Sequence, residues 1–329
     1  MVSRVADVQR RAALIFAQID AAKRLYQSMD EDTSSLMSDD SMYMSMLIDL
    51  YNNEYQLARL VDTSDLIVHA EGPAAVDSAP NAGVVKWLIQ NVNDNMRKLF
   101  QGALHLTAPQ MKEFNLKLTG IAPGSIYAGF AIEGGSRSDL FLPNQSVTSE
   151  AKAVLQSFLT IPQFVANSQL NPEISEAILD PVVRDSAIVA AYNLSPTGRM
   201  GINSLELTSP DRPSSPAAEF SAASRSVLKT AATRPQLSKK RQHYGSFTGD
   251  LRGIDLDQTR LDLRNVESTE ISTLRCFLAS LDPQQAKQWI GKRVKVTGNY
   301  EALDDGMPRL MRIDTVEVVE SPVQNKLFE

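Results

Sequence analysis

The sequence has little of the sulfur and imidazole chemistry that metal and redox sites use. Among 329 residues there is one cysteine, Cys276, and there are three histidines, His69, His105 and His243. A single thiol cannot form a disulfide within the chain, and no histidine pairs with another His, Cys or Asp at the spacing of a zinc site. We therefore expect no bound metal, no cofactor, and a reducing compartment in which Cys276 packs as a small apolar side chain.

Long hydrophobic runs are also missing. No apolar stretch approaches the roughly 20 residues that are needed to span a bilayer. The first residues lead directly into an amphipathic helix without the apolar core of a signal peptide. The chain has 43% hydrophobic and 22% charged residues, which is ordinary for a globular protein. These features predict a cytoplasmic protein with no membrane partner.

Motifs of catalysis are absent too. The segment Gly198-Arg199-Met200-Gly201 lacks the following Lys and Ser or Thr of a phosphate-binding loop. No Gly-x-Ser-x-Gly turn is present, and the acidic pairs Asp39-Asp40 and Asp304-Asp305 fall in expected loops. We therefore expect no catalytic residues and a non-enzymatic protein; an active site assembled from distant residues is the open alternative.

The chain begins with a strongly patterned helix, expected over residues 3–29. Its apolar side chains recur at alternating spacings of three and four, which is the seam of a coiled coil or a helical hairpin. Val8, Ile15, Ile19 and Tyr26 belong to this seam. The pattern predicts packing against the next helix of the same chain, and self-association of copies into an oligomer is the alternative.

Residues 1–208 read as a helix-rich α+β domain with a small, mostly antiparallel sheet. The expected helices are residues 41–61, 83–106, 149–167 and 172–194, the last interrupted near Asp180-Pro181. A short strand is expected at 66–68, a hairpin at 114–132 and another strand at 201–208. The following residues, 209–242, read as a connector, in which Ser215-Pro216 starts a short helix.

Residues 243–320 alternate apolar and polar side chains with the period of two that strands show. The expected strands are 244–254, 260–266, 271–279, 292–301 and 309–319, with a helix from Asp282 to Gly291 between the third and the fourth. A helix at that place is the order of OB-folds, so this segment resembles an OB-fold, a small five-stranded β-barrel.

The resemblance implies a binding surface. OB-folds bind oligonucleotides or proteins through strands two and three and through two loops, which correspond here to residues 255–259 and 302–308. Both loops are acidic, and the formal net charge of the whole chain is −6. Strands two to four nevertheless supply a set of basic residues, which are the candidates for nucleic-acid binding: Arg260, Arg264, Arg275, Lys292, Arg293 and Lys295.

The last residues, 321–329, read as a flexible tail. Gln324, Leu327 and Phe328 resemble the short peptide by which bacterial replication and repair proteins dock on the sliding clamp. In such a peptide two apolar side chains, here Leu327 and Phe328, insert into a pocket of the partner protein. Asn325 stands where that peptide usually has Leu.

Together these patterns predict an adaptor whose barrel contacts a protein or a nucleic acid. One alternative is an accessory factor of DNA metabolism that binds single strands and docks on the clamp. Another is an accessory subunit of a bacterial antiphage defence or toxin–antitoxin system. Protein partners, nucleic acid and a second copy of the chain are thus the expected partners.

Overall fold

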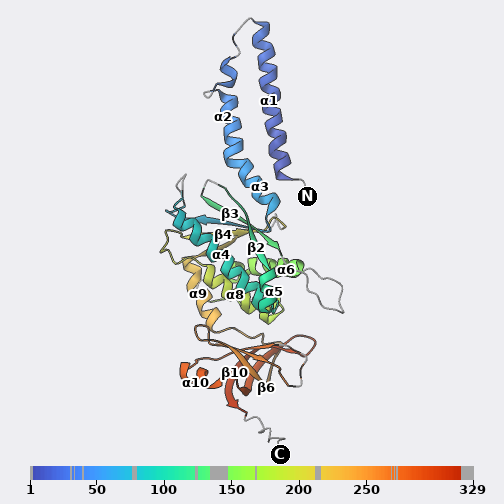
Figure 1. Cartoon of the computed structure of the whole chain (residues 1–329), viewed down its shortest axis with the longest axis vertical. Helices are drawn as coiled ribbons and strands as arrows, with labels where there is room; N and C mark the ends of the chain where they lie inside the picture. Colours follow the sequence, from blue (N-terminus) through green and yellow to red (C-terminus); the bar gives the residue numbers. More distant parts are fainter. Residues whose placement is uncertain are drawn as a thin grey trace, which may run out of the picture. The chain divides into compact units, whose positions relative to one another are not determined.

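The computed structural model shows a mixed α+β fold with two sheets, a five-stranded antiparallel sheet and a closed five-stranded barrel (Figure 1). This confirms the predicted fold class. The structure describes residues 3–29, 32, 34–38, 41–75, 80–122, 125–133, 147–166, 169–211, 216–267, 269, 271 and 273–319.

The secondary structure follows the order predicted from the sequence, with three additions. The helices are α1 (Arg4–Ser28), η1 (Ser34–Met37), α2 (Met42–Asp49), η2 (Leu50–Tyr55), α3 (Gln56–Thr63), α4 (Ala82–Ala103), α5 (Ala108–Glu113), α6 (Val147–Leu159), η3 (Ile161–Phe164), α7 (Ile174–Ala177), α8 (Pro181–Leu194), α9 (Ala222–Thr233) and α10 (Pro283–Trp289). The strands are β1 (Leu66–Glu71), β2 (Asn115–Ala122), β3 (Ile126–Glu133), β4 (Ser204–Thr208), β5 (Ala218–Ser221), β6 (Gln242–Asp255), β7 (Arg260–Arg264), β8 (Thr273–Phe277), β9 (Arg293–Ala302) and β10 (Pro308–Val318). The additions are η1, α5 and β5.

The chain divides into two compact units that are each discontinuous in sequence. Unit 1 comprises Met1–Asp94, Lys112–Lys152 and Pro196–Ala222, and unit 2 comprises Asn95–Met111, Ala153–Ser195 and Ala223–Glu329. The sequence predicted instead four consecutive segments, residues 1–208, 209–242, 243–320 and 321–329. Whether these segments fold independently stays a prediction, which limited proteolysis can test.

In unit 1, α1 packs along α2, η2 and α3, which together form the second arm of a helical hairpin (Figure 1). Asp62 near the end of α3 fastens the start of α1, because its carboxylate accepts hydrogen bonds from Arg4 N at 3.0 Å and Val5 N at 2.9 Å. Burial alone would raise the pKa of Asp62, but these bonds and the one from Ser3 outweigh it and lower that pKa. The packing of α1 against the helices that follow it confirms the predicted packing within the chain.

The sheet of unit 1 has the strand order β2-β3-β1-β4-β5. Successive side chains of a strand point to opposite faces, so one face is core and the other is polar. The core face carries Val68, Ala70, Leu205, Leu207 and Phe220, all at most 1% exposed.

The edge strand β5 corrects the prediction that a helix starts at Ser215-Pro216. Ala218 and Phe220 are buried and Glu219 is exposed, which is the alternation of a strand, and the segment pairs with β4. Pairing at the sheet edge satisfies the backbone that an isolated first helical turn would leave open. The helix α9 begins only at Ala222.

The barrel of unit 2 closes in the order β10-β8-β7-β6-β9, with β10 parallel to β8. Its strands lie within a few residues of their predicted bounds, and α10 stands between β8 and β9 as expected. The closed barrel is consistent with an OB-like fold. Cys276 lies in its core and is fully buried, and burial raises its pKa well above the usual value, so its thiol packs as an apolar group as predicted.

Within the described ranges, none of the helices combines the length and the apolar character that crossing a lipid bilayer requires.

Candidate functional site

Helix α8 binds the barrel of unit 2 through three consecutive polar residues. Asp180 caps the helix, accepting a hydrogen bond from Val182 N at 2.8 Å. Arg184, Asp185 and Ser186 follow in the second turn and are all buried. Each of the three contacts a different strand of the barrel, so the helix is fixed in both position and rotation.

Arg184 donates to Glu301 of β9, with Nη2 and Oε2 2.5 Å apart. Glu301 is completely buried, and its carboxylate also accepts from Arg241 Nη2 at 3.1 Å and from Ser238 N at 2.9 Å. The two guanidinium groups and the amide occupy both carboxylate oxygens. A buried carboxylate is tolerated only when it is paired in this way.

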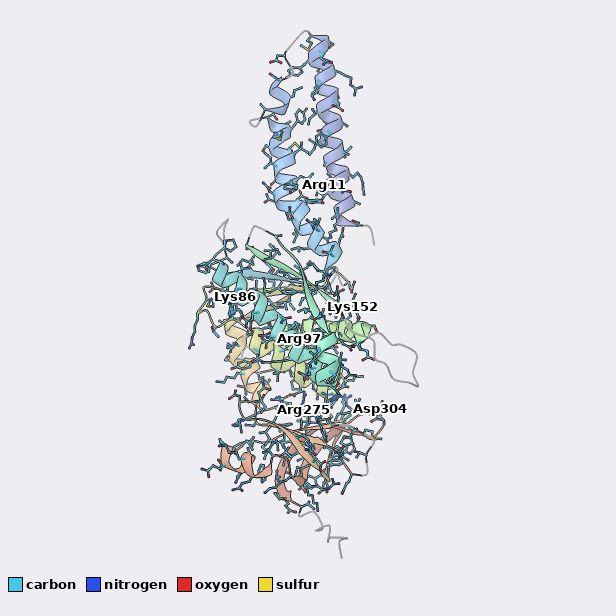
Figure 2. All side chains as sticks on the ribbon, viewed as in Figure 1. Arg11, Lys86, Arg97, Lys152, Arg275 and Asp304 are labelled. Atoms are coloured by element: carbon cyan, nitrogen blue, oxygen red, sulfur yellow. The ribbon has the colours of Figure 1, made fainter. Side chains whose placement is uncertain are left out.

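Asp185 forms the second contact, with Arg260 of β7. Arg260 Nε donates to Asp185 Oδ2 at 2.9 Å and Nη2 donates to Oδ1, which makes a bidentate pair. Arg275 of β8, labelled in Figure 2, completes the set by donating to Ser186 Oγ at 2.8 Å. We call these contacts of residues 184–186 the α8–barrel network.

The network changes how the basic candidates are interpreted. Arg260 is only 6% exposed and is bound to Asp185, so its guanidinium is not presented to an outside phosphate. Arg293 is held by Asp250 and Glu267. Arg264, Lys292 and Lys295 are exposed, but only Arg264 lies beside Arg260 and Arg275. The structure therefore does not gather the six candidates into one basic face.

A polar groove of about 440 Å³ lies beside the network, within unit 2. Its walls are the second half of α4, helix α8, and the strands β6, β7 and β8 with the loop after β6. We call it the barrel groove. The side chains that its polar walls offer are Asn95, Lys98, Gln101, His105, Asn193, Asp255, Gln258, Asp262, Arg264, Thr273 and Arg275. The groove thus covers the surface that OB-like barrels use for ligands.

Three of the candidates predicted from the sequence, Arg260, Arg264 and Arg275, lie in the barrel wall of this groove. The residues of the helical wall were not predicted. Asn95, Lys98 and His105 lie more than a hundred residues before β6, and no local pattern links them to a barrel. His105 has a backbone φ of 51°. Its side chain is exposed at the surface, but desolvation by the surrounding protein atoms, and then the positive charge of Arg275, lower the pKa of its imidazole. Its imidazole is therefore mainly neutral at pH 7.

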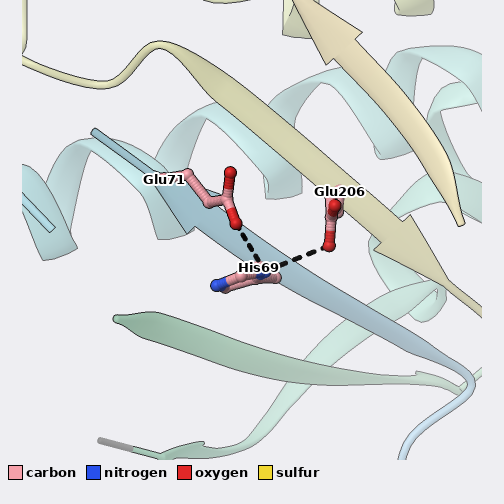
Figure 3. Close-up of side chains that lie close together, drawn as sticks. All are labelled: His69, Glu71 and Glu206. Atoms are coloured by element: carbon pink, nitrogen blue, oxygen red, sulfur yellow. Dashed lines mark hydrogen bonds and ion pairs between the residues drawn. The ribbon is translucent and has the colours of Figure 1, made fainter. Parts of the chain in front are cut away.

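A second cluster lies in unit 1, on the polar face of the sheet. His69 Nδ1 is 3.1 Å from Glu206 Oε2 and 3.8 Å from Glu71 Oε1 (Figure 3). His69 Nε2 is 2.5 Å from Ser125 Oγ, and the ring stacks on Tyr127. The expectation from the sequence compared each histidine with His, Cys and Asp only, so it did not consider these two glutamates. The spacing His69-x-Glu71 on a strand was the local signal, and Glu206 was beyond reach because it lies on another strand.

The candidates for self-association are already partly covered. Val8, Ile15 and Ile19 are buried and Tyr26 is half-buried, so most of this seam serves the helical hairpin itself. Leu14 and Leu25 are instead 59% and 58% exposed. The candidate clamp peptide, Gln324, Leu327 and Phe328, lies outside the described residues.

If copies associate through α1, Leu14→Lys combined with Leu25→Lys is expected to reduce the mass of the particle in solution to that of a monomer. The reason is that burying a charge in an apolar contact costs free energy. Light scattering at several concentrations measures the mass. Gln9→Lys combined with Gln18→Lys adds the same two charges at exposed polar positions of α1 and serves as the control. A wild-type chain that is monomeric at every concentration rules out this mode of association.

Comparison with known proteins adds no family to these observations: no protein-family description matches the chain, and no curated protein is significantly similar to it in sequence.

Proposed function

We propose that this protein is a non-enzymatic adaptor that holds an extended, acidic segment of a partner protein in the barrel groove. The observation that carries the proposal is the place and chemistry of the groove. It lies on β7, β8 and the loop after β6, and polar side chains line most of it. OB-like barrels bind proteins or oligonucleotides at this surface.

The lining favours a peptide over a nucleic acid. Gln101 and Asn193 offer amide donors and acceptors that match a peptide backbone, and Gln258 adds an amide donor. Proteins that bind single strands stack bases on aromatic rings. Within the described part of unit 2, no Phe, Tyr or Trp lines the groove. Phe247 and Trp289 of the same unit pack against the barrel core.

The charges of the groove favour an acidic segment. Arg260 is neutralised by Asp185, and Arg275 lies 3.6 Å from Asp262. Lys98 and Arg264 are exposed, and against the exposed carboxylate of Asp255 they leave the lining an excess of one positive charge. Because the α8–barrel network fixes the walls before a ligand arrives, little ordering free energy is lost on binding.

We expect that acidic peptides selected by display against the full chain lose at least about tenfold in affinity for a Lys98→Glu, Arg264→Glu variant, since reversal replaces attraction by repulsion. The control is Lys292→Glu, Lys295→Glu, which makes the same charge change on residues that do not line the groove. Titration calorimetry measures the affinities.

Two outcomes contradict the proposal. In the first, the selected peptides bind the groove variant and the wild type equally, which places their binding site outside the groove. In the second, single-stranded oligonucleotides bind the wild type in a salt-sensitive way but do not bind the groove variant, and peptides bind neither protein. The ligand of the groove is then a nucleic acid.

A further inference from the structure

We propose that His69, Glu71 and Glu206 form a binding site for a divalent transition-metal cation of the Zn²⁺ class. His69 Nδ1 lies 3.1 Å from Glu206 Oε2 and 3.8 Å from Glu71 Oε1, and all three ligand atoms lie within 4.8 Å of one another. Tetrahedral zinc with bonds of 2.0–2.1 Å requires ligand atoms about 3.4 Å apart. The two distances from Nδ1 bracket this value, so only small side-chain rotations are needed to bind the ion.

The sheet sets this arrangement through its register. His69 of β1 lies directly opposite Glu206 of β4. Glu71 follows His69 by two residues, so its side chain projects from the same face. The opposite face of both strands is core, where Val68, Ala70 and Leu205 are fully buried. The ligands therefore stand on a rigid support, which a preorganised site requires.

Neighbouring groups orient the ligands. His69 Nε2 contacts Ser125 Oγ at 2.5 Å, and the imidazole stacks on Tyr127 with ring centroids 4.1 Å apart. Ser204 Oγ donates to Glu71 Oε2 at 3.3 Å, leaving Oε1 for the ion. When Nδ1 binds a cation, Nε2 carries the proton, and the Ser125 hydroxyl can accept it in a hydrogen bond. Such contacts to the second ring nitrogen are typical of metal-binding histidines.

The negative charge on this face of the sheet also favours the binding of a cation. Glu206 lies opposite Glu219 of β5 in the register, and Glu71 adds a third carboxylate near one imidazole. Like charges directly opposite each other on a sheet are destabilising, and a divalent ion offsets them. The imidazole selects Zn²⁺ and its neighbours over Mg²⁺ and Ca²⁺, which take oxygen ligands.

The same groups contain the connectivity of a catalytic triad, Ser125–His69–Glu206. A triad uses one carboxylate to orient its histidine. Glu71 has no role in that arrangement, whereas a cation uses it as the third ligand. Three protein ligands leave a fourth position for water, as in many zinc sites that remain open. The side chains of Glu71 and Glu206 are 51% and 38% exposed, so the ion and its water have a path from solvent.

Titration calorimetry of the full chain with Zn²⁺ tests the proposal. The wild type is expected to bind one ion per chain in this site, and Glu71→Gln combined with Glu206→Gln is expected to weaken that binding about 100-fold, because amides replace both anionic ligands. Glu133→Gln removes one charge from β3 of the same sheet and is the control, since Glu133 pairs with Lys117 instead. Its affinity for Zn²⁺ should equal that of the wild type.

A second measurement does not depend on the folding of a variant. Zn²⁺ binds only the folded site, so the wild-type melting temperature is expected to rise with Zn²⁺ concentration, and Mg²⁺ at the same concentration should leave it unchanged. The proposal is overturned if Zn²⁺ binds the wild type and the double variant with the same affinity and stoichiometry. It is equally overturned if micromolar Zn²⁺ neither binds the wild type nor raises its melting temperature.

Discussion

Replacing Glu301 with glutamine is expected to lower the free energy of unfolding by about 3–5 kcal/mol. Glu301 is completely buried, and its carboxylate is the counter-charge of Arg184 and Arg241. The amide keeps the shape of the side chain but leaves two guanidinium groups without a negative partner, and the Arg184 side chain is itself only 3% exposed. An unpaired buried charge costs far more than the ion pair contributes.

Urea unfolding of the full chain measures this loss. Trp289 packs against the barrel core, so its fluorescence reports the unfolding of unit 2, and a Trp87→Phe background removes the other tryptophan of the chain. The control is Glu267→Gln, which removes one of the two acidic partners of Arg293 at an exposed position and should hardly move the midpoint. Equal midpoints for Glu301→Gln and the control would mean that solvent reaches the Glu301 pair.

The α8–barrel network has a consequence for ligand binding. An OB-like barrel offers its second and third strands to a partner, and here Arg260 and Arg275 of those strands bind α8 of the same chain. Under the proposed function, part of the expected ligand surface is thus occupied by the chain itself. What remains open is the barrel groove, whose second wall is helical. A partner bound as proposed would have to fit between a sheet and helices, and such a space would select a narrow, extended segment.

The barrel was predictable because its signals are local. Leu261 and Leu263 alternate with charged residues on one strand, and Val294 and Val296 do so on another. A period of two over five residues identifies a strand without knowledge of its partner. Asp282-Pro283 likewise identifies the start of α10, since Asp282 accepts from Gln284 N at 3.0 Å. The resemblance to an OB-fold then predicted that these strands form a five-stranded barrel.

The sites were less predictable because their partners are distant in sequence. An arginine on a strand looks the same whether it faces water or a carboxylate, and Asp185 lies 75 residues before Arg260. Glu206 lies 137 residues after His69, and only the register of β1 and β4 brings them together. At Pro216 the local helix-start signal was present, but the edge of β4 offered hydrogen bonds that outweighed it. In each case a tertiary contact decided what the local sequence left open.

Gly298→Ala is expected to destabilise the barrel by about 3 kcal/mol or more, because its strand has no room for a methyl group. Gly298 of β9 pairs with Gly245 of β6 and with Ile313 of β10, next to an irregularity in the register. A Cβ at this position would overlap the carbonyl oxygen of Arg312 and lie 3.0 Å from Asp314 N. Both obstacles are backbone atoms, so relief requires moving β10 and opening the barrel.

Gly291→Ala is the matched control for this substitution. Gly291 has a φ of 78°, which costs alanine about 1 kcal/mol, but nothing lies within 4 Å of its added Cβ. Urea unfolding followed through Trp289 in the Trp87→Phe background compares the two variants. A loss at Gly298 no larger than the loss at Gly291 would show that β9 and β10 separate without cost. The barrel would then be about as stable open between β9 and β10 as closed, and the rigidity of the groove wall would rest on the α8–barrel network alone.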